Sequence, residues 1–175
     1  MIRKYLSKTL PIILAVIMLQ PTSTEAAGGH APIGYQVMCL KNPHLSECRG
    51  GGASHVKSSP ALMATLKRVN SSVNSRVSGR RDGAGTDVWS ASASSGDCEE
   101  YAMAKRRALI KAGLPASSLR IAYVKTRKGS GHAVLIVKTG KSDLVLDVLT
   151  QKIRPLSQSG LRLVSMSGAN PRQWS

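Results

Sequence analysis

The sequence predicts a domain of the α+β class, in which helices near its start pack on an antiparallel β-sheet. Two helical patterns come first, over residues 60–77 and 97–112, and extended apolar runs then follow without a helix between them. Consecutive strands without crossover helices pair in antiparallel fashion. A length of 175 residues suits one domain, and we place it at residues 59–175.

Residues 1–27 have the pattern of a secretory signal peptide. Basic residues open the chain, an apolar run follows at residues 10–19, and small residues precede a cleavage point near Ala27. The apolar run is shorter than a bilayer-spanning helix needs, and no other segment is apolar enough to span a membrane. We therefore expect a periplasmic or secreted protein that is not integral to the membrane; an uncleaved membrane anchor is the alternative.

Residues 28–58 are rich in glycine, serine, proline and histidine, and we expect irregular structure there. Cys39 and Cys48 flank the turn signal Asn42-Pro43. Exported proteins keep disulfides, and we predict that these two cysteines pair. Three of the four histidines also fall in this segment: His30, His44 and His55. Their spacing matches no zinc pattern, so we interpret them as solvated loop side chains.

Apolar residues at spacings of three and four predict the first helix, over residues 60–77. The apolar stripe comprises Leu62, Leu66, Val69, Val73 and Val77. The opposite, polar side comprises Lys67, Arg68, Asn70, Ser71 and Asn74. Ser59 and Pro60 fit the cap and the first position of this helix. In the loop at residues 79–96 we expect Trp89 to anchor the chain to the core, a place in a cleft wall being the alternative.

The second helix and the sheet follow this loop. A helical period runs from Asp97 to Gly113, and Lys105 alone interrupts its apolar face. Strands are predicted at residues 119–126, 132–139, 143–150 and 161–167. The short turn GKS joins the second and third of these strands, which predicts a β-hairpin.

Cys98, in the stretch GDCEEYA, is the cysteine that the predicted disulfide leaves unpaired. Asp97 fits the cap position of the second helix, and Glu100 lies three residues further on, which predicts a capping box. A thiol at the first helical position faces the positive end of the helix dipole, which lowers a cysteine pKa. Acidic neighbours raise a cysteine pKa, and we expect the lowering of the pKa by the helix to be the larger effect. The alternative is that Cys98 pairs with one of the other two cysteines.

A nucleophilic cysteine needs a base, and the base needs an orienting group. His132 opens one strand of the predicted hairpin and Asp147 lies in the other. Counted outward from Gly140 in the turn, the two side chains lie close together across the hairpin. We therefore predict a Cys–His–Asp triad of Cys98, His132 and Asp147. Purely structural roles for His132 in a turn and for Asp147 at an edge or bulge are the alternatives.

Three blocks of the sequence, GDCEEYAMAKRRALIKAGLPASSLRIAYV, GHAVLIV and LVLDVLT, resemble the bacterial transglutaminase-like cysteine proteinases. These are exported relatives of the periplasmic proteinase that releases large biofilm adhesins. The resemblance runs from about Leu62 to Ile153 and implies a papain-like, transglutaminase-like fold. It also implies the roles of the triad: Cys98 as nucleophile, His132 as general base and acid, and Asp147 as the orienting carboxylate.

The resemblance further implies calcium, with Asp97 and Glu99 as candidate ligands, although the chemistry itself needs no cofactor. A competing role for Asp97 is the helix cap described above. Two positions depart from the family pattern: Glu100 stands where adhesin-cleaving members carry Asp, and Val148 where many members carry Asn. These departures leave the three triad residues in place but leave the substrate open.

The chain has 25 basic and 9 acidic residues, a formal net charge of +16. Such an excess favours anionic partners, such as envelope polymers or acidic proteins. Few aromatic residues lie among the basic ones, so no stacking platform for nucleic acid is evident, and we expect no specific nucleic-acid binding.

The sequence as a whole predicts an exported cysteine hydrolase, a periplasmic protease that cleaves a protein substrate through a thioester. Two alternatives remain open. One is an acyl transferase of the transglutaminase type, which passes through the same thioester. The other is a basic, envelope-binding module with a vestigial triad.

Overall fold

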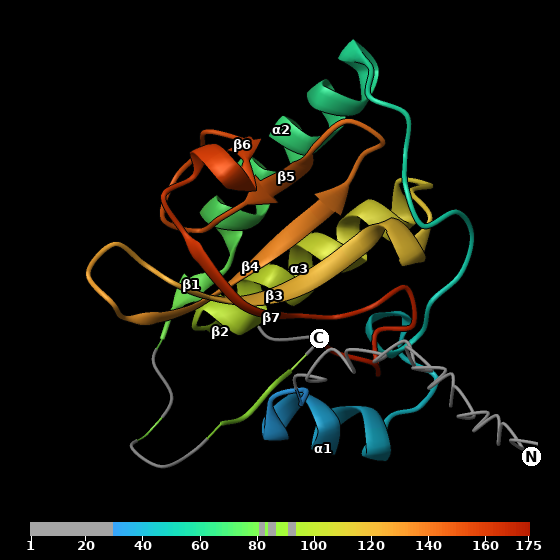
Figure 1. Ribbon diagram of the computed structural model, residues 1–175. Coiled ribbons are helices and arrows are strands. Elements are labelled where there is room, and N and C mark those ends of the chain that lie inside the picture. Colours follow the sequence, from blue (N-terminus) through green and yellow to red (C-terminus); the bar gives the residue numbers. More distant parts are fainter. Residues whose placement is uncertain (1–29, 81–82, 84–86, 91–93) are drawn as a thin grey trace, which may run out of the picture.

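A computed structural model describes residues 30–80, 83, 87–90 and 94–175 of the chain (Figure 1). The predicted signal peptide at residues 1–27 lies outside the described residues. Within the described ranges, no helix has the length and apolar character needed to cross a membrane.

A five-stranded antiparallel sheet forms the centre of the molecule (Figure 1). Its strands are β3 (Leu119–Lys125), β4 (Gly131–Lys138), β5 (Asp143–Leu146), β6 (Arg154–Pro155) and β7 (Arg162–Met166). They lie in the order β6-β5-β4-β3-β7, and every neighbouring pair is antiparallel. The predicted antiparallel sheet is confirmed, including the hairpin of β4 and β5. Two details differ, since β5 ends at Leu146 and the short strand β6 was not predicted.

Two helices, α2 (Pro60–Arg76) and α3 (Cys98–Lys111), cover one face of this sheet. The core between helices and sheet is aliphatic, with Leu66 and Val73 from α2 meeting Leu109 from α3 and Leu135 from β4. The Ser59 hydroxyl accepts a hydrogen bond from the Leu62 amide at 3.1 Å, as the predicted cap requires. Both predicted helices are therefore present, with ends within one or two residues of the predicted ones.

A pair of short parallel strands brings the two ends of the loop at residues 79–96 together. β1 (Ser78–Gly79) follows α2, and β2 (Ser95–Gly96) leads directly into α3. Trp89 in this loop is buried, and its ring packs edge-on against Tyr35 with 5.3 Å between ring centroids. Trp89 therefore anchors the loop, as predicted, and the anchored loop fixes the approach of the chain to α3.

The expectation of irregular structure throughout residues 28–58 is wrong, because Ile33–Lys41 form the helix α1 and Ser46–Cys48 form a 3₁₀ turn. Tyr35 and Met38 are buried, but apolar residues also stand on the exposed side of α1: Ile33, Val37 and Leu40. With apolar residues on both sides, the sequence lacks the one-sided stripe by which a helix is found. The three histidines of this segment are exposed, as predicted.

The predicted disulfide between Cys39 and Cys48 is present, with 5.5 Å between the two Cα atoms. It holds α1 to the 3₁₀ turn, and both sulfur atoms are buried in a second cluster that includes Met103 of α3 and Ile121 of β3. The N-terminal segment is thus part of the same folded body as the helices and the sheet. In Figure 1, α1 lies below β7, at the opposite end of the molecule from α2.

Arg106 of α3 joins this segment to the core through hydrogen bonds to main-chain carbonyl groups. The side chain is fully buried, and its guanidinium donates to the carbonyl oxygens of Ser46, Arg49, Ala116 and Leu119 at 2.5–3.1 Å. A guanidinium offers five N–H donors in a fixed fork, so a single side chain can satisfy several buried acceptors.

We expect Arg106→Met to lower the free energy of unfolding by about 3 kcal/mol, because several buried carbonyl oxygens lose their donor. Urea unfolding followed by circular dichroism measures this change. The matched control is Arg68→Met, which removes an exposed arginine from α2 and should change the value by less than about 0.5 kcal/mol. Equal stability of the two variants would contradict the assigned role of Arg106.

Candidate active site

The first turn of α3 is fixed by a capping box, as the sequence predicts. The Asp97 carboxylate accepts a hydrogen bond from the Glu99 amide at 3.4 Å, and the Glu100 carboxylate accepts one from the Asp97 amide at 3.1 Å. Glu100 also accepts a hydrogen bond from the Ser90 amide at 2.9 Å, which ties the anchored loop to the helix. Burial raises the pKa of Glu100 to about 7. Cys98 is therefore held as the first residue of α3.

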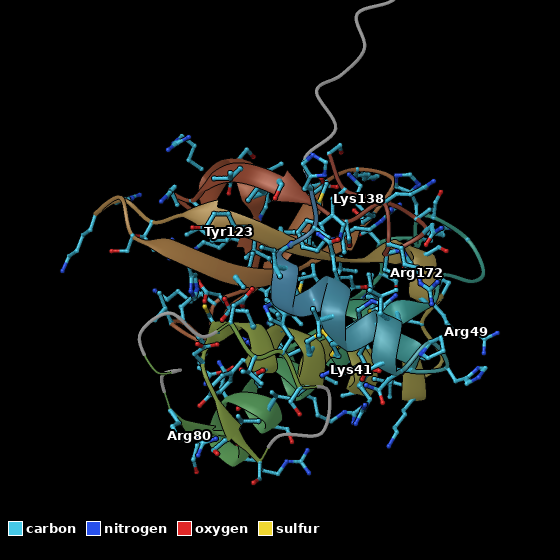
Figure 2. All side chains as sticks on the ribbon, turned by 90° about the horizontal axis from the view of Figure 1, so that it is seen from below. Lys41, Arg49, Arg80, Tyr123, Lys138 and Arg172 are labelled. Atoms are coloured by element: carbon cyan, nitrogen blue, oxygen red, sulfur yellow. A yellow bond between two sulfur atoms is a disulfide. The ribbon has the colours of Figure 1, made fainter. Side chains whose placement is uncertain are left out.

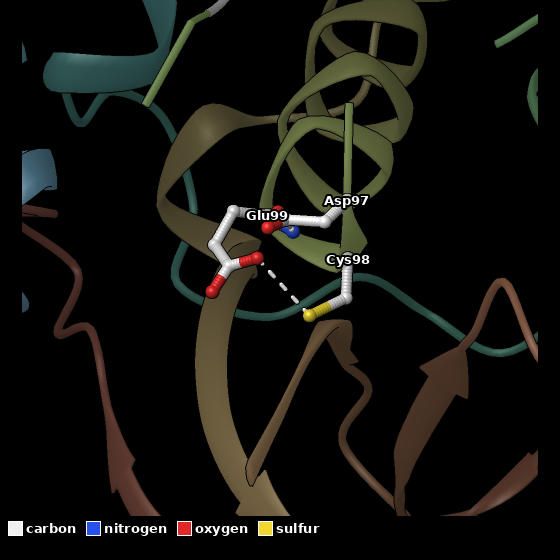
Figure 3. Close-up of side chains that lie close together, drawn as sticks. All are labelled: Asp97, Cys98 and Glu99. Atoms are coloured by element: carbon white, nitrogen blue, oxygen red, sulfur yellow. Dashed lines mark hydrogen bonds between the residues drawn. The ribbon is translucent and has the colours of Figure 1, made fainter. Parts of the chain in front are cut away.

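The Cys98 side chain is a free thiol, which rules out the alternative that it pairs with Cys39 or Cys48. It is half-buried and donates a hydrogen bond to the Glu99 carboxylate at 3.0 Å. Figure 3 shows Asp97, Cys98 and Glu99 gathered at this turn, with that hydrogen bond dashed.

The expected lowering of the thiol pKa is wrong for this arrangement. Burial raises the pKa of Cys98, and the negative charge and the hydrogen bond of Glu99 raise it further. A backbone hydrogen bond with Ala133 opposes these effects without cancelling them. The sequence shows the acidic neighbours and the helix start, but it does not show how far the thiol is removed from water.

His132 and Asp147 form the hydrogen-bonded pair that the hairpin predicts. Their Nε2 and Oδ1 atoms are 2.7 Å apart, and both side chains are buried. Among the described residues, His132 Nδ1 has no hydrogen-bond partner, so the interaction with Asp147 is made by Nε2 alone. Asp147 lies one residue beyond β5 rather than inside a strand. Its Oδ1 also accepts from the Leu149 amide at 3.0 Å, and this local turn ends the strand.

Hydrogen bonding has a larger effect than burial on the pKa of Asp147. Burial by itself would raise the pKa of Asp147, but the hydrogen bonds from His132 and from the Leu149 amide hold it below the ordinary value of an aspartate. The carboxylate is therefore ionised at neutral pH. An ionised carboxylate beside an imidazole fixes the ring orientation and stabilises the ring when it gains a proton.

The thiol and the imidazole face the same cleft, which has a volume of about 860 Å³. Its wall includes Cys98 and Asp97 from the start of α3 and His132 from β4. Ala133, which follows His132 in the strand, is the residue whose backbone hydrogen-bonds to the Cys98 sulfur. The structure thus places Cys98 and His132 at one cleft, and Asp147 lies behind His132 as its hydrogen-bond partner.

Asn74 is a site residue whose place the sequence analysis assigned wrongly. It was placed on the polar side of the first helix, but its side-chain amide donates to the Asp147 carbonyl oxygen at 3.0 Å. Asn70, one turn earlier, is fully buried and donates to the Thr150 carbonyl oxygen at 3.2 Å. Both asparagines directly follow apolar stripe positions, and this spacing is the signal that could have indicated an inward orientation.

A cation could be held at the start of α3. Among the described residues, Asp97, Cys98 and Glu99 form the group of His, Cys, Asp and Glu side chains with ligand atoms close enough for this, all within 4.8 Å of one another. Burial, followed by the hydrogen bond with Asp97, raises the pKa of Glu99 to about 8. Two carboxylates crowded in this way are the hard oxygen ligands that calcium prefers.

Comparison with known protein families gives a match over residues 25–175, to the model of the bacterial transglutaminase-like cysteine proteinases. The chain belongs to this family. The family match covers the N-terminal segment as well as the helices and sheet. Comparison with the curated proteins gave no significant match.

Solved structures of LapG from Legionella pneumophila are similar to this cysteine proteinase. The calcium-bound form shares 30% sequence identity at a TM-score of 0.57, over 65% of this chain and 68% of LapG. The EGTA-treated form shares 33% identity at a TM-score of 0.54, over 63% and 64% of the two chains. This likeness confirms the transglutaminase-like α+β fold, and the family shows that the chain is a cysteine peptidase.

We expect Asp147→Asn to remove part of the pH dependence of stability. Because the folded-state pKa of Asp147 lies below its unfolded value, the carboxylate stabilises the fold above the unfolded pKa, and this stabilisation is lost as pH falls through the folded pKa. The free energy of unfolding of the wild type should therefore fall more steeply below about pH 5 than that of Asp147→Asn.

Chemical unfolding at a series of pH values measures both slopes. The matched control is Asp143→Asn, which removes a half-exposed carboxylate bound to Lys138 and should leave the slope close to that of the wild type. Identical slopes for Asp147→Asn and the wild type would contradict the argument.

Proposed function

We propose that this cysteine peptidase is a periplasmic or secreted protease that hydrolyses a protein substrate with a Cys98–His132–Asp147 triad. The observation that carries the proposal is the buried, hydrogen-bonded pair of His132 and Asp147, with His132 lining the same cleft as Cys98. Removal of residues 1–27 as a signal peptide would deliver the protein to that compartment. A protein on the cell surface or in the periplasm is then the substrate class.

The reaction begins when the Cys98 thiol turns from Glu99 toward His132 and gives its proton to Nδ1. The sulfur attacks the carbonyl carbon of the scissile peptide, and the oxygen gains negative charge. N–H groups at the start of α3 lack helical partners and stabilise this oxyanion. When the C–N bond breaks, the imidazolium donates its proton to the leaving amine, and a thioester remains on Cys98.

Hydrolysis of the thioester repeats these proton transfers with water as the nucleophile. His132 takes a proton from the water, the resulting tetrahedral species expels the Cys98 sulfur, and the sulfur regains a proton from the imidazolium. Asp147 keeps its charge throughout and stabilises the imidazolium in each step. An amine in place of water would give acyl transfer, the transglutaminase-type alternative.

We propose further that Asp97 and Glu99 bind calcium. The donor set supports this, because two crowded carboxylates at one helix start gain from a divalent cation. The bound ion would supply positive charge beside the thiol and occupy the Glu99 carboxylate that otherwise accepts from Cys98. That LapG has calcium-bound and EGTA-treated structures also supports the proposal.

A basic, envelope-binding role is the second candidate, and the placement of acidic residues favours it. Every Asp and Glu in the described part accepts a hydrogen bond or ion pair from within the protein: Glu47, Asp87, Asp97, Glu99, Glu100, Asp143 and Asp147. Apart from the buried Lys105, Arg106 and Arg120, the described cations are spread over the surface; in Figure 2, Arg49 and Arg80 lie on opposite sides of the molecule. Such a surface suits anionic polymers or acidic proteins as partners.

The protease proposal predicts new protein termini that depend on Cys98. Terminal proteomics of the exported fraction should find them in wild-type cells and not in Cys98→Ala cells. Incubating that fraction from Cys98→Ala cells with purified protein should restore them. Asp147→Asn should cleave about 10⁴-fold more slowly, because the imidazole loses the carboxylate that orients and stabilises it. If wild type and Cys98→Ala gave identical termini while both bound anionic polymers, the binding module would be the correct function.

The calcium proposal predicts tight binding that depends on both carboxylates. Calorimetric titration of the purified protein with calcium should show one site, and free calcium at 100 times Kd should stabilise the fold by about 2.7 kcal/mol. Asp97→Asn and Glu99→Gln should each weaken binding by at least about tenfold, whereas Asp143→Asn should bind like the wild type. Unchanged affinity in both site variants would place any bound calcium elsewhere.

A further inference from the structure

Three cations line the cleft that holds Cys98, and the proposed mechanism gives them no role. Arg80 follows β1, whereas Arg127 and Lys128 belong to the turn between β3 and β4. All three side chains are exposed. In the described lining of the cleft, Asp97 is the one acidic residue, and its carboxylate already caps α3. The cleft is therefore bordered by an excess of positive charge.

These cations have no acidic partner within the described part of the chain. The ion pairs found there use other cations, namely Arg107, His132 and Lys138. The main chain nevertheless holds Arg80 close to the site, because its amide donates to the Gly96 carbonyl oxygen at 2.7 Å. The positive charge at the cleft is thus available to a bound molecule.

The turn that carries the other two cations is closed by main-chain hydrogen bonds. The Thr126 amide donates to the Ser130 carbonyl oxygen at 2.9 Å. Arg127 also packs tightly against Gly160, where an added Cβ would collide with the guanidinium. Figure 1 shows this turn projecting past the sheet on the side of β1. The cations therefore have defined places on two separate segments of the cleft wall.

The rest of the wall suits a polypeptide. Val148 and Leu149 supply apolar surface, and Leu149 is 69% exposed. Small residues form much of the remainder: Gly79, Gly96, Ser130 and Gly131. Glycines let another main chain approach closely. Apolar surface beside cations fits a polypeptide better than a polysaccharide, because a polypeptide carries apolar and acidic side chains together.

We propose that this cleft preferentially binds protein segments with Asp or Glu within a few residues of the scissile bond. The inference rests on the proposed protease function and adds the class of sequence that is cut. A carboxylate that meets Arg127 or Lys128 gains a charge-assisted hydrogen bond. The planar guanidinium of Arg127 also matches the two oxygens of a carboxylate. A substrate segment without acidic residues leaves these cations unpaired.

The test measures which bonds the purified protein cuts in a peptide library prepared from a whole bacterial proteome. Mass spectrometry identifies the new termini, and Cys98→Ala gives the background. Asp and Glu should be over-represented about threefold to fivefold around the wild-type cuts, as expected for exposed ion pairs. In the double variant Arg127→Gln/Lys128→Gln this preference should fall toward the library average. In Arg127→Glu/Lys128→Glu it should change to Lys and Arg, a gain that a folding defect cannot produce.

The matched control is Arg68→Gln/Lys141→Gln, which removes two exposed cations outside the cleft. It has the same net charge as the first double variant and should keep the wild-type preference. Wild-type cuts without acidic enrichment would overturn the proposal. An equal loss of preference in the control would do so too, because net charge and not the cleft would then be responsible.

Failure of the protease function is recognised separately. If the wild type makes no cut that Cys98→Ala lacks, the proposed function is wrong, and binding then decides the question. Two fluorescein-labelled peptides, one of alternating glutamate and alanine and one of alternating glutamine and alanine, are titrated with the Cys98→Ala protein and followed by fluorescence anisotropy.

Tighter binding of the glutamate peptide supports the proposal if Arg127→Gln/Lys128→Gln abolishes the difference and the control variant keeps it. Equal binding of the two peptides, or an equal loss in the control, overturns the proposal. A cleft variant that loses binding of dextran sulfate but not of the glutamate peptide would assign these cations to anionic polymers, and this result also overturns it.

Discussion

The position of Cys98 depends on the hydrogen bonds that Glu100 makes at the first turn of α3. Its carboxylate binds the Asp97 amide, which fixes the residue at which the helix begins, and the Ser90 amide, which ties down the loop before it. The chain passes so close that a Cβ at Gly96 would lie 2.5 Å from the Glu100 side chain. A shift of the helix start by one residue would turn Cys98 by about 100° around the helix axis, away from the cleft.

The same turn places carboxyl groups beside the thiol. Glu99 and Glu100 have raised pKa values, mainly because they are buried, and the Cys98 thiol is hydrogen-bonded to Glu99. These groups oppose formation of a thiolate, whereas the helix start and the backbone hydrogen bond with Ala133 favour it. Cys98 thus stands where a nucleophile would be expected, at the start of a helix, but its surroundings raise the pKa of its thiol. A cation bound by Asp97 and Glu99 would favour the thiolate by its positive charge, and this would be the physical role of the proposed calcium site.

Periodicity and turn spacing in the sequence predict most of this fold and much of its site. The stripe from Leu62 to Val73 predicts α2, and the count outward from Gly140 places Asp147 beside His132. Patterns of residue type do not report burial, however. The helix α1 was not predicted because Ile33 and Leu40 are apolar on its exposed side. The direction of the thiol pKa shift was predicted wrongly because it depends on desolvation.

Two consecutive buried cations of α3 show how differently arginine and lysine serve a protein interior. Arg106 donates to carbonyl oxygens through every arm of its guanidinium, and these hydrogen bonds account for its burial. Lys105 is equally buried, but among the described residues it makes no hydrogen bond, and its ammonium lies 5.9 Å from the centroid of the Tyr101 ring. An arginine stays charged in nearly any setting, whereas a lysine responds to burial through its pKa. The helix α3 thus joins the N-terminal segment to the core through the charged Arg106, whereas burial at the neighbouring position lowers the pKa of Lys105 to about 7.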